Sequence, residues 1–137
     1  MGSRRSRRDV VEAARLEMER CGLSHLARLP CAELSTGQRR LVELARLLAA
    51  DYQFLLLDEP SSGLDQGETE SFGLVVAEAV ADRGVGVLLV EHDMALIRQL
   101  CSFIYVLDFG ELIYQGQAGD VLSADAVKKA YLGTEAA

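Results

Sequence analysis

Two short apolar segments, each followed by a cluster of acidic residues, limit the fold of this chain more than any other feature. Phe54 to Leu57 is followed by Asp58-Glu59-Pro60, and Val85 to Val90 by Glu91-His92-Asp93. Such apolar runs are typical of strands buried on both faces of a parallel sheet. Apolar residues from Phe72 to Val80 recur at helical spacing and stop near Gly84, which predicts a helical crossover between the strands. The expected fold class is α/β, a parallel sheet with flanking helices.

Helical periodicity also predicts the elements on either side of this unit. Asp9 is expected to cap a helix that runs to Cys21 and stops at Gly22. A second helix is expected to open at the segment Leu34-Ser35-Thr36-Gly37-Gln38, because apolar residues follow it at helical spacing. Toward the C-terminus the sequence predicts a helix around Met94 to Cys101, a hairpin of Phe103 to Leu107 with Glu111 to Gln115, and a helical ending from Asp120 to Leu132.

Length and charge exclude several classes of protein. The 137 residues suit one domain. Residues 1–50 carry 10 basic and 6 acidic side chains, and residues 51–137 carry 4 and 15, so no nucleic-acid partner is expected. The apolar runs are far shorter than the ~20 residues of a bilayer-spanning helix. Cys21, Cys31 and Cys101 are odd in number and lack CxxC spacing, which argues against a disulfide framework or a structural zinc site.

The acidic residues after the two strands are candidates for phosphate chemistry. Ligands of open parallel sheets bind beyond the carboxyl ends of the strands. Asp58 could hold a magnesium ion, because this hard cation prefers carboxylate oxygen. Glu59 could accept a proton from an attacking water, and His92 could orient that water or contact a terminal phosphate. Alternatively, Asp58 and Glu59 only cap the following turn. If these two residues are considered alone, the capping and the catalytic interpretations have equal weight.

The segment from Leu34 to Gln38 adds a candidate anion site. Ser35 as N-cap, followed by Thr36 and Gly37, presents backbone N–H groups at the positive end of a helix dipole. An ordinary helix cap is the more frequent meaning of such a sequence taken alone. The order of the motifs along the chain is more specific than any one of them.

In this order the motifs resemble those of the nucleotide-binding subunit of ABC transporters. The resemblance covers about Asp9 to Gly133. Two segments are most similar to the ATPases of branched-chain amino-acid importers: Glu91-His92-Asp93-Met94 and Ala130-Tyr131-Leu132-Gly133. Thr36 stands where the family signature LSGGQ usually has its first glycine. The matching positions are Ser35, Thr36, Gly37 and Gln38 in the signature, Asp58 in Walker B, Glu59 as catalytic glutamate, Ser62 to Asp65 as D-loop and His92 as switch histidine.

One family motif is missing from this sequence. A phosphate-binding P-loop needs GxxxxGK[ST], and the two lysines, Lys128 and Lys129, lie in no glycine context. The resemblance therefore implies the C-terminal half of a P-loop NTPase-like domain whose central P-loop strand is absent. It divides the chain into a basic disordered tail (1–8), a remnant of the helical subdomain with the signature helix (9–50), and a core with hairpin and final helix (51–137). An incomplete sheet of this kind invites pairing with another chain.

The resemblance also implies a function. It predicts a subunit that binds and hydrolyses ATP, with ATP and Mg²⁺ as cofactors. The expected partners are a second nucleotide-binding subunit and membrane permease subunits. The expected localisation is cytoplasmic, on the inner face of the cell membrane. Glu59 and His92 would be catalytic, Asp58 would hold the metal, and the signature residues with Asp65 would bind nucleotide. The alternative is a catalytically incompetent half-domain that supplies its signature and D-loop to a P-loop-bearing partner.

Overall fold

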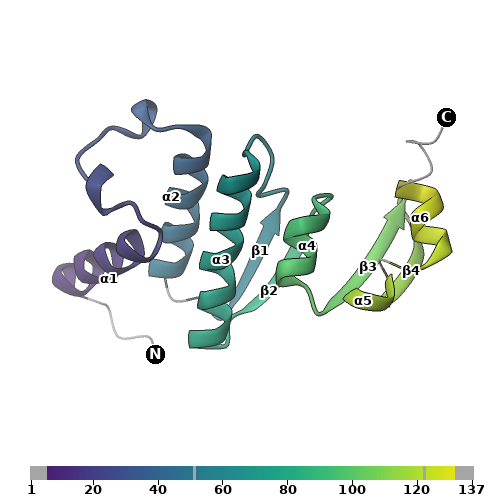
Figure 1. Ribbon diagram of the computed structural model, residues 1–137. Coiled ribbons are helices and arrows are strands. Elements are labelled where there is room, and N and C mark those ends of the chain that lie inside the picture. Colours follow the sequence, from purple (N-terminus) through teal and green to yellow (C-terminus); the bar gives the residue numbers. More distant parts are fainter. Residues whose placement is uncertain (1–5, 51, 122, 132–137) are drawn as a thin grey trace. The chain divides into compact units, whose positions relative to one another are not determined.

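The computed structural model describes residues 6–50, 52–121 and 123–131 (Figure 1). The chain forms two compact units, Met1–Leu96 and Ile97–Ala137. The first contains the helices α1 (Arg7–Arg20), α2 (Thr36–Ala49) and α3 (Gln66–Arg83), the strands β1 (Phe54–Asp58) and β2 (Gly86–Val90), and the short 3-10 turns η1 (Ser24–Leu26) and η2 (Cys31–Glu33). The second contains β3 (Phe103–Asp108), β4 (Glu111–Gln117), α5 (Ala118–Val121) and α6 (Asp125–Tyr131), and α4 (Met94–Leu100) crosses the boundary.

Helix α1 begins earlier than the sequence predicts. Ser6, and not Asp9, is the N-cap: its hydroxyl accepts from the Asp9 N–H, and the Asp9 carboxylate accepts from the Ser6 N–H. Asp9 therefore occupies the third helical position of a capping box, where its charge also favours the helix dipole. Gly22 ends the helix with a φ of 67°, as expected for the left-handed stop.

A buried carboxylate joins α1 to α3. Glu17 is 2% exposed and forms ion pairs with Arg83 of α3 and with Arg20 of its own helix, 3.5 Å from the Arg20 Nε. Arg20 also lies 2.9 Å from an Asp82 carboxylate oxygen, and Arg83 donates to the Leu48 carbonyl of α2. The three helices of the first unit are therefore tied together by charge-assisted contacts at their ends.

Strands β1 and β2 pair in parallel from Phe54 opposite Gly86 to Asp58 opposite Val90, as predicted. The prediction that these strands are buried on both faces is wrong. Leu55 and Leu57 are buried, whereas Phe54 and Leu56 are exposed, so β1 has one covered face and one open face. Strand residues alternate between faces, and only the helix-bearing side of this sheet is covered.

Helix α3 connects β1 to β2 and supplies most of the buried apolar side chains on its side. Asp65 caps its start through the Glu68 N–H, and Gly84, with a φ of 65°, ends it. Its buried positions recur at helical spacing and include Phe72, Val75, Val76 and Ala79. Buried Leu44 and Leu48 of α2 add to the same core. The predicted helical crossover between parallel strands is confirmed.

The second unit is a hairpin with two short helices. Strands β3 and β4 pair antiparallel around Phe109 (φ 45°) and Gly110 (φ 84°), as predicted. Val106, Val121 and Val127 form its buried cluster. The predicted single helix from Asp120 to Leu132 is instead α5 and α6, because Ser123 turns the chain by donating its N–H and its hydroxyl to the Asp120 carbonyl. Leu132 lies outside the described residues.

The four strands form two separate two-stranded sheets, β1 with β2 and β3 with β4. No strand of the described residues joins them. None of the helices in the described part of the chain has the length and apolar content to cross a membrane.

Candidate functional site

The end of β1 carries two successive exposed carboxylates, Asp58 and Glu59. Asp58 is the last strand residue, and the N–H of Glu59 donates to the Val90 carbonyl at 2.8 Å. Glu59 then turns with a φ of 42°, in the left-handed region that residues other than glycine rarely adopt. Such conformations cluster at functional sites. The turn closes when the Ser62 N–H donates to the Glu59 carbonyl at 3.1 Å.

His92, which follows β2, lies beside Glu59. The Nδ1 atom of His92 is 4.0 Å from the Glu59 Oε1 and 3.5 Å from the Glu91 Oε2. Both side chains are exposed, Glu59 by 57% and His92 by 68%. The structure therefore brings the two predicted catalytic residues together at the carboxyl ends of adjacent parallel strands. We call Asp58, Glu59 and His92 the strand-end cluster.

Glu91 holds the backbone on either side of this cluster through hydrogen bonds. Its side chain is fully buried and accepts four hydrogen bonds: from the Ser61 N–H (2.9 Å) and hydroxyl (2.5 Å) at Oε1, and from the N–H groups of His92 (2.7 Å) and Asp93 (3.1 Å) at Oε2. Burial by itself would raise the pKa of the Glu91 carboxyl, but these hydrogen bonds, led by that of the Ser61 hydroxyl, lower the pKa below its ordinary value. Glu91 is thus a buried anion that joins the turn after β1 to the turn after β2.

Sequence reasoning missed this role of Glu91 and Ser61. The available signal was an acid at the end of a buried strand, followed by residues whose N–H groups a carboxylate can accept. Glu91 and Glu59 both follow a strand directly, so position alone does not distinguish the buried acid from the exposed one. Glu59 has a positive φ and an exposed side chain, whereas the serine two residues later provides donors for Glu91.

The segment Leu34–Gln38 opens α2 as predicted. The Ser35 hydroxyl accepts from the Gln38 N–H at 3.1 Å, and the Gln38 Oε1 accepts from the Ser35 N–H at 2.9 Å. Ser35 and Thr36 are exposed, and an Arg39 nitrogen lies 3.5 Å from the Thr36 hydroxyl. Ser35 and Thr36 at the positive end of the helix dipole are therefore accessible to solvent, whereas Gly37 is buried.

The start of α2 packs against the loop that precedes α3 and the first turn of that helix. A Cβ at Gly37 would overlap the Glu68 carboxylate, and a Cβ at Gly63 would lie 3.4 Å from the Thr36 methyl group. Asp65 of the same loop uses its carboxylate to cap α3. The predicted binding residues Ser35 to Gln38 therefore lie next to the loop that carries Gly63 and Asp65.

The donor set near Asp58 suits one kind of metal binding. In the described residues no group of three His, Cys, Asp or Glu side chains could hold a metal ion by itself. Magnesium, however, is often held by one or two carboxylates together with substrate phosphates and water. A single exposed carboxylate at the end of a strand, such as Asp58, fits that mode and does not fit an all-protein cage.

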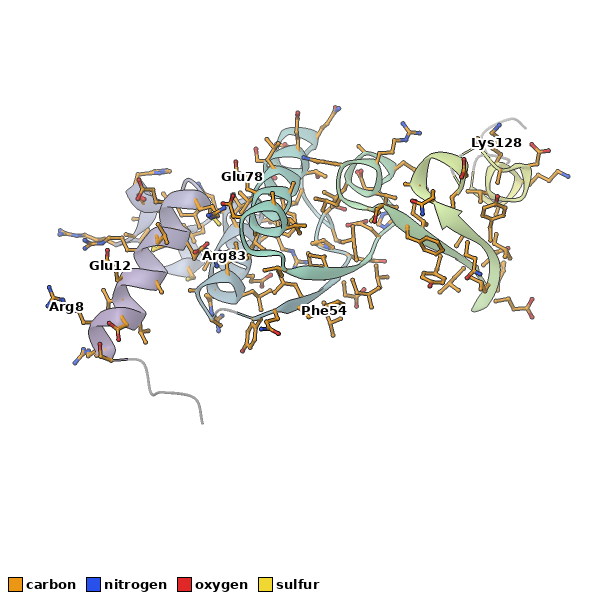
Figure 2. The ribbon with its side chains drawn as sticks, turned by 90° about the horizontal axis from the view of Figure 1, so that it is seen from below. Arg8, Glu12, Phe54, Glu78, Arg83 and Lys128 are labelled. Carbon is orange, nitrogen blue, oxygen red and sulfur yellow. The ribbon has the colours of Figure 1, made fainter. Side chains whose placement is uncertain are left out.

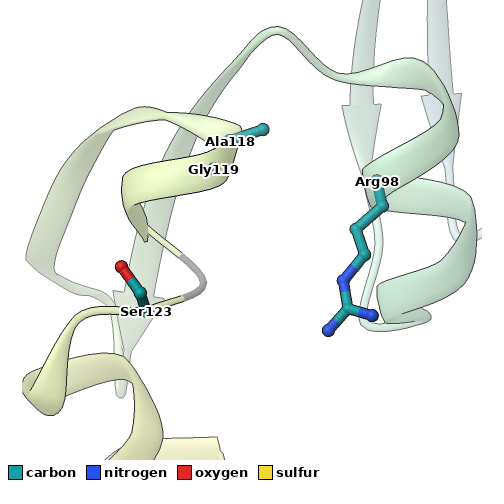
Figure 3. Close-up of a pocket in the computed structure, with 4 residues that line it drawn as sticks. All are labelled: Arg98, Ala118, Gly119 and Ser123. Atoms are coloured by element: carbon teal, nitrogen blue, oxygen red, sulfur yellow. The ribbon is translucent and has the colours of Figure 1, made fainter.

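Each unit contains a cavity along its described residues. One lies between α2 and the end of β1 and is lined by Arg40, Glu43, Leu56, Asp58 and Pro60 among others, so it belongs to the predicted site. The other lies in the second unit and is lined by Arg98, Ala118, Gly119 and Ser123 (Figure 3). Arg98 is its one charged group, and the Ser123 hydroxyl is already bonded to a carbonyl. None of the predicted site residues lines this second cavity.

Comparison with known sequences identifies relatives of this chain. A family model described as "ABC transporter" matches residues 5–62. The branched-chain amino acid transport ATP-binding protein BraF of Pseudomonas aeruginosa is 35% identical over 130 residues, which cover 95% of this chain and 51% of the relative. The lipopolysaccharide export system ATP-binding protein LptB of Escherichia coli K12 is 36% identical over 118 residues, covering 86% of this chain and 48% of the relative.

Solved structures give the same result for the fold. The ADP conformation of an ATP-binding cassette of an ABC transporter matches with a TM-score of 0.81 and 30% identity, covering 96% of this chain and 52% of that one. A nucleotide-free ATP-binding cassette matches with a TM-score of 0.79 and 30% identity. The chain thus spans about half the length of the relatives it matches, and the predicted α/β fold of the P-loop NTPase type is confirmed.

Proposed function

Because the chain belongs to the ATP-binding domains of ABC transporters, we propose that it forms part of a subunit that hydrolyses ATP to drive transport. The observation that carries this proposal is the approach of Glu59 and His92 at the carboxyl ends of β1 and β2. This is the position at which open parallel sheets bind their ligands. The start of α2 beside the loop before α3 adds a second group of residues suited to phosphate.

In the proposed reaction a water molecule attacks the terminal phosphate of ATP in line with the leaving group. Glu59 orients this water and accepts its proton, and His92 donates a hydrogen bond to the phosphate being transferred. A positioned general base of this kind typically contributes ~10²–10⁴-fold in rate. Asp58 would hold Mg²⁺, which supplies charge neutralisation on the phosphate oxygens.

The start of α2 would bind the terminal phosphate of a nucleotide held mainly by a second subunit. Ser35 supplies its hydroxyl, and Thr36, Gly37 and Gln38 lie at the positive end of the helix dipole. The Glu68 carboxylate next to Gly37 has the same charge as the phosphate, so binding requires this side chain to turn away. Asp65, which holds the loop before α3 in place, would lie at the same interface between subunits.

For the cargo, we propose uptake of a solute, with branched-chain amino acids as the first candidate. The similarity to BraF supports this, since it extends over 95% of the chain. The similarity to LptB, over 86% of the chain, supports lipopolysaccharide export as the competing function. In either case the proposed partners are a second nucleotide-binding subunit and membrane permease subunits, which would hold the chain at the inner face of the membrane.

A second candidate function follows from the missing phosphate-binding motif. The sequence has no GxxxxGK[ST], so by itself the chain would not hydrolyse ATP. As an incompetent half-domain it would instead offer the start of α2 and the loop before α3 to a partner that carries the phosphate-binding loop. Such a partner would turn over ATP faster with this chain than without it, whether or not Glu59 is intact.

The test is ATP hydrolysis by the chain alone and by the chain mixed with the part of BraF that lies outside its match to this sequence. We expect no turnover alone, magnesium-dependent turnover in the mixture, and a loss of at least roughly 100-fold with Glu59→Gln. Glu12→Gln, an exposed carboxylate of α1, is the matched control and should have no effect.

Each other outcome has a defined meaning. Glu59-dependent turnover by the chain alone would show that it is complete for catalysis and contradict the proposal. Stimulated turnover that survives Glu59→Gln would favour the incompetent half-domain. A mixture that binds no ATP would reject both functions.

A further inference from the structure

Glu59 and His92 lie close together, although their side chains hold each other only weakly. These side chains are 57% and 68% exposed, and the Glu59 Oε1 and the His92 Nδ1 are 4.0 Å apart. Ion pairs between exposed side chains contribute little, because water and salt screen the charges. The backbone must therefore bring the two side chains together. The buried Glu91 carboxylate binds the backbone of both turns that carry them.

One oxygen of Glu91 fixes the turn after β2. Its Oε2 accepts from the N–H groups of His92 at 2.7 Å and Asp93 at 3.1 Å. The Asp93 carboxylate in turn accepts from the Leu96 N–H at 2.9 Å, in the first turn of α4. The Glu91 Oε2 also lies 3.5 Å from the His92 Nδ1. One buried anion therefore contacts His92 both at its backbone N–H and at its ring.

The other oxygen of Glu91 fixes the turn after β1. Its Oε1 accepts from the N–H of Ser61 at 2.9 Å and from the Ser61 hydroxyl at 2.5 Å. Glu59, two residues earlier, donates its N–H to the Val90 carbonyl and accepts from the Ser62 N–H. Of the four donors to Glu91, the Ser61 hydroxyl alone belongs to a side chain. This hydrogen bond therefore depends on which residue stands at position 61.

We propose that Glu91 and Ser61 are positioning residues for ATP hydrolysis, which hold His92 beside Glu59. The Glu91 side chain is fully buried, so it acts through the two turns and not on the nucleotide. A buried anion with all its hydrogen bonds satisfied is rigid, and misplacing a reacting group by about 1 Å can lower a rate on the order of 10²-fold. Their effect on the rate rests on the proposed function, whereas their effect on the geometry does not require ATP.

The first measurement is nuclear magnetic resonance spectroscopy of the whole chain without nucleotide. In the wild type we expect nuclear Overhauser contacts between the His92 ring and the Glu59 side chain. Ser61→Ala removes one donor to Glu91 and leaves three, so the chain should fold but lose these contacts. Ser61→Thr retains a hydroxyl and should keep them. Ser71→Ala is the matched control and should also keep them, because the Ser71 hydroxyl donates to a carbonyl within α3.

The second measurement is ATP hydrolysis by the mixture with the unmatched part of BraF. Ser61→Ala should lower kcat by at least roughly tenfold and leave the KM for ATP unchanged, because a positioning residue does not bind the substrate. Glu91→Gln should have the same effect. Its control is Glu12→Gln, on α1 and apart from the β1–β2 sheet (Figure 2). Circular dichroism checks folding, and Ser61→Ala decides alone if Glu91→Gln does not fold.

Several results would overturn the proposal. The first is the absence of His92–Glu59 contacts in the wild type, and the second is their persistence in Ser61→Ala. A loss of contacts that Ser61→Thr or Ser71→Ala shows to the same extent would exclude a specific role of the Ser61 hydroxyl. A raised KM with unchanged kcat would indicate substrate binding instead of positioning. A wild-type mixture without turnover would reject the proposed function, and the spectroscopic comparison would still decide whether Ser61 and Glu91 position His92.

Discussion

At the scale of single residues, Glu91 shows how a buried charge can position exposed ones. Its carboxylate accepts hydrogen bonds from Ser61 after β1 and from His92 and Asp93 after β2. All four donors are matched to the anion, so the network is fully satisfied and rigid. The two turns it joins carry Glu59 and His92, and their mutual distance depends on this contact.

Glu91→Gln should therefore destabilise the first unit in a pH-dependent manner. The pKa of Glu91 is lower in the folded state than in the unfolded state, so its contribution is present above the unfolded pKa and is lost as pH falls through the folded pKa. At pH 7 we expect a loss of about 2–4 kcal/mol in free energy of unfolding, because the amide places donors against donors. Urea unfolding across pH 3–7 measures it.

The gap between wild type and Glu91→Gln should close toward the acid end of that range. Glu12→Gln, at an exposed position of α1, should match the wild type throughout. If Glu91→Gln lowered the free energy of unfolding by the same amount at pH 3 and at pH 7, the assignment of a buried, ionised Glu91 would be contradicted.

Much of this site was predictable from the sequence at the level of backbone position. The placement of Asp58, Glu59 and His92 at two strand ends follows from apolar runs that stop at polar residues, and the capping role of Ser35 follows from its spacing to Gln38. The burial of Glu91 was not predictable, because it depends on the left-handed turn at Glu59 and on donors thirty residues away at Ser61.

At the scale of elements, the first unit is organised by helix ends. Glu17, Arg20 and Arg83 fix the end of α1 against the end of α3, and the start of α2 packs against the start of α3 through Gly37 and Glu68. The start of α2 is therefore held against α3, and Arg83 of α3 donates to the Leu48 carbonyl near the end of α2. The orientation of the predicted phosphate-binding segment depends on these contacts.

Gly37→Ala should weaken this packing, because the new Cβ would overlap the Glu68 carboxylate. The carboxylate is the end of a flexible side chain and can turn away, so we expect a loss of about 0.5–1.5 kcal/mol in the free energy of unfolding, the usual contribution of a hydrogen bond such as the one it accepts from the Asp65 N–H. Glu68→Ala in the same chain should recover most of the loss attributable to the overlap. Gly67→Ala, where the nearest atom is 3.4 Å away, is the control and should be neutral or stabilising. Chemical unfolding of the wild type, Gly37→Ala, Glu68→Ala and the double variant gives the coupling energy, and additive effects would refute the contact.

The elements also show which parts of the fold a pattern can predict. Strand and helix identity follow from periodicity and caps, and β1, β2, α3 and the hairpin all form where the sequence predicts. The prediction that both strand faces are buried was wrong, since an apolar run shows that a strand suits a buried position but not how many of its faces are covered. The break between α5 and α6 depends on one serine turn, which helical spacing does not reveal.

At the scale of the whole molecule, the described residues form two units with separate cores. The first core combines α2, β1 and α3, and the second is the cluster of Val106, Val121 and Val127. The second unit is small, and small units bury a low fraction of their surface. Its stability therefore depends strongly on each of these three valines.

Val121→Ala should lower the protection of the second unit only. Val121 is 1% exposed, and removing its two methyl groups should cost about 2 kcal/mol. Native-state hydrogen exchange should show faster exchange at amides of β3 and β4 and unchanged exchange at β1 and β2. Val76→Ala, also 1% exposed but in α3, should give the reverse pattern. Equal acceleration in both sheets for either variant would mean that the units unfold as one.

The connectivity of the two sheets sets different folding times for the two units. The partners in the β3–β4 hairpin are close in sequence, and hairpins of this kind form in about 1–10 μs. Strands β1 and β2 are separated in the sequence by the whole of α3, so their contacts join residues that are far apart along the chain. Contacts of such long sequence separation slow folding, because loop-closure entropy is lost before they form. Until then the apolar run of β1 is exposed to solvent on both faces, and during this interval the chain is most open to misassembly with its neighbours.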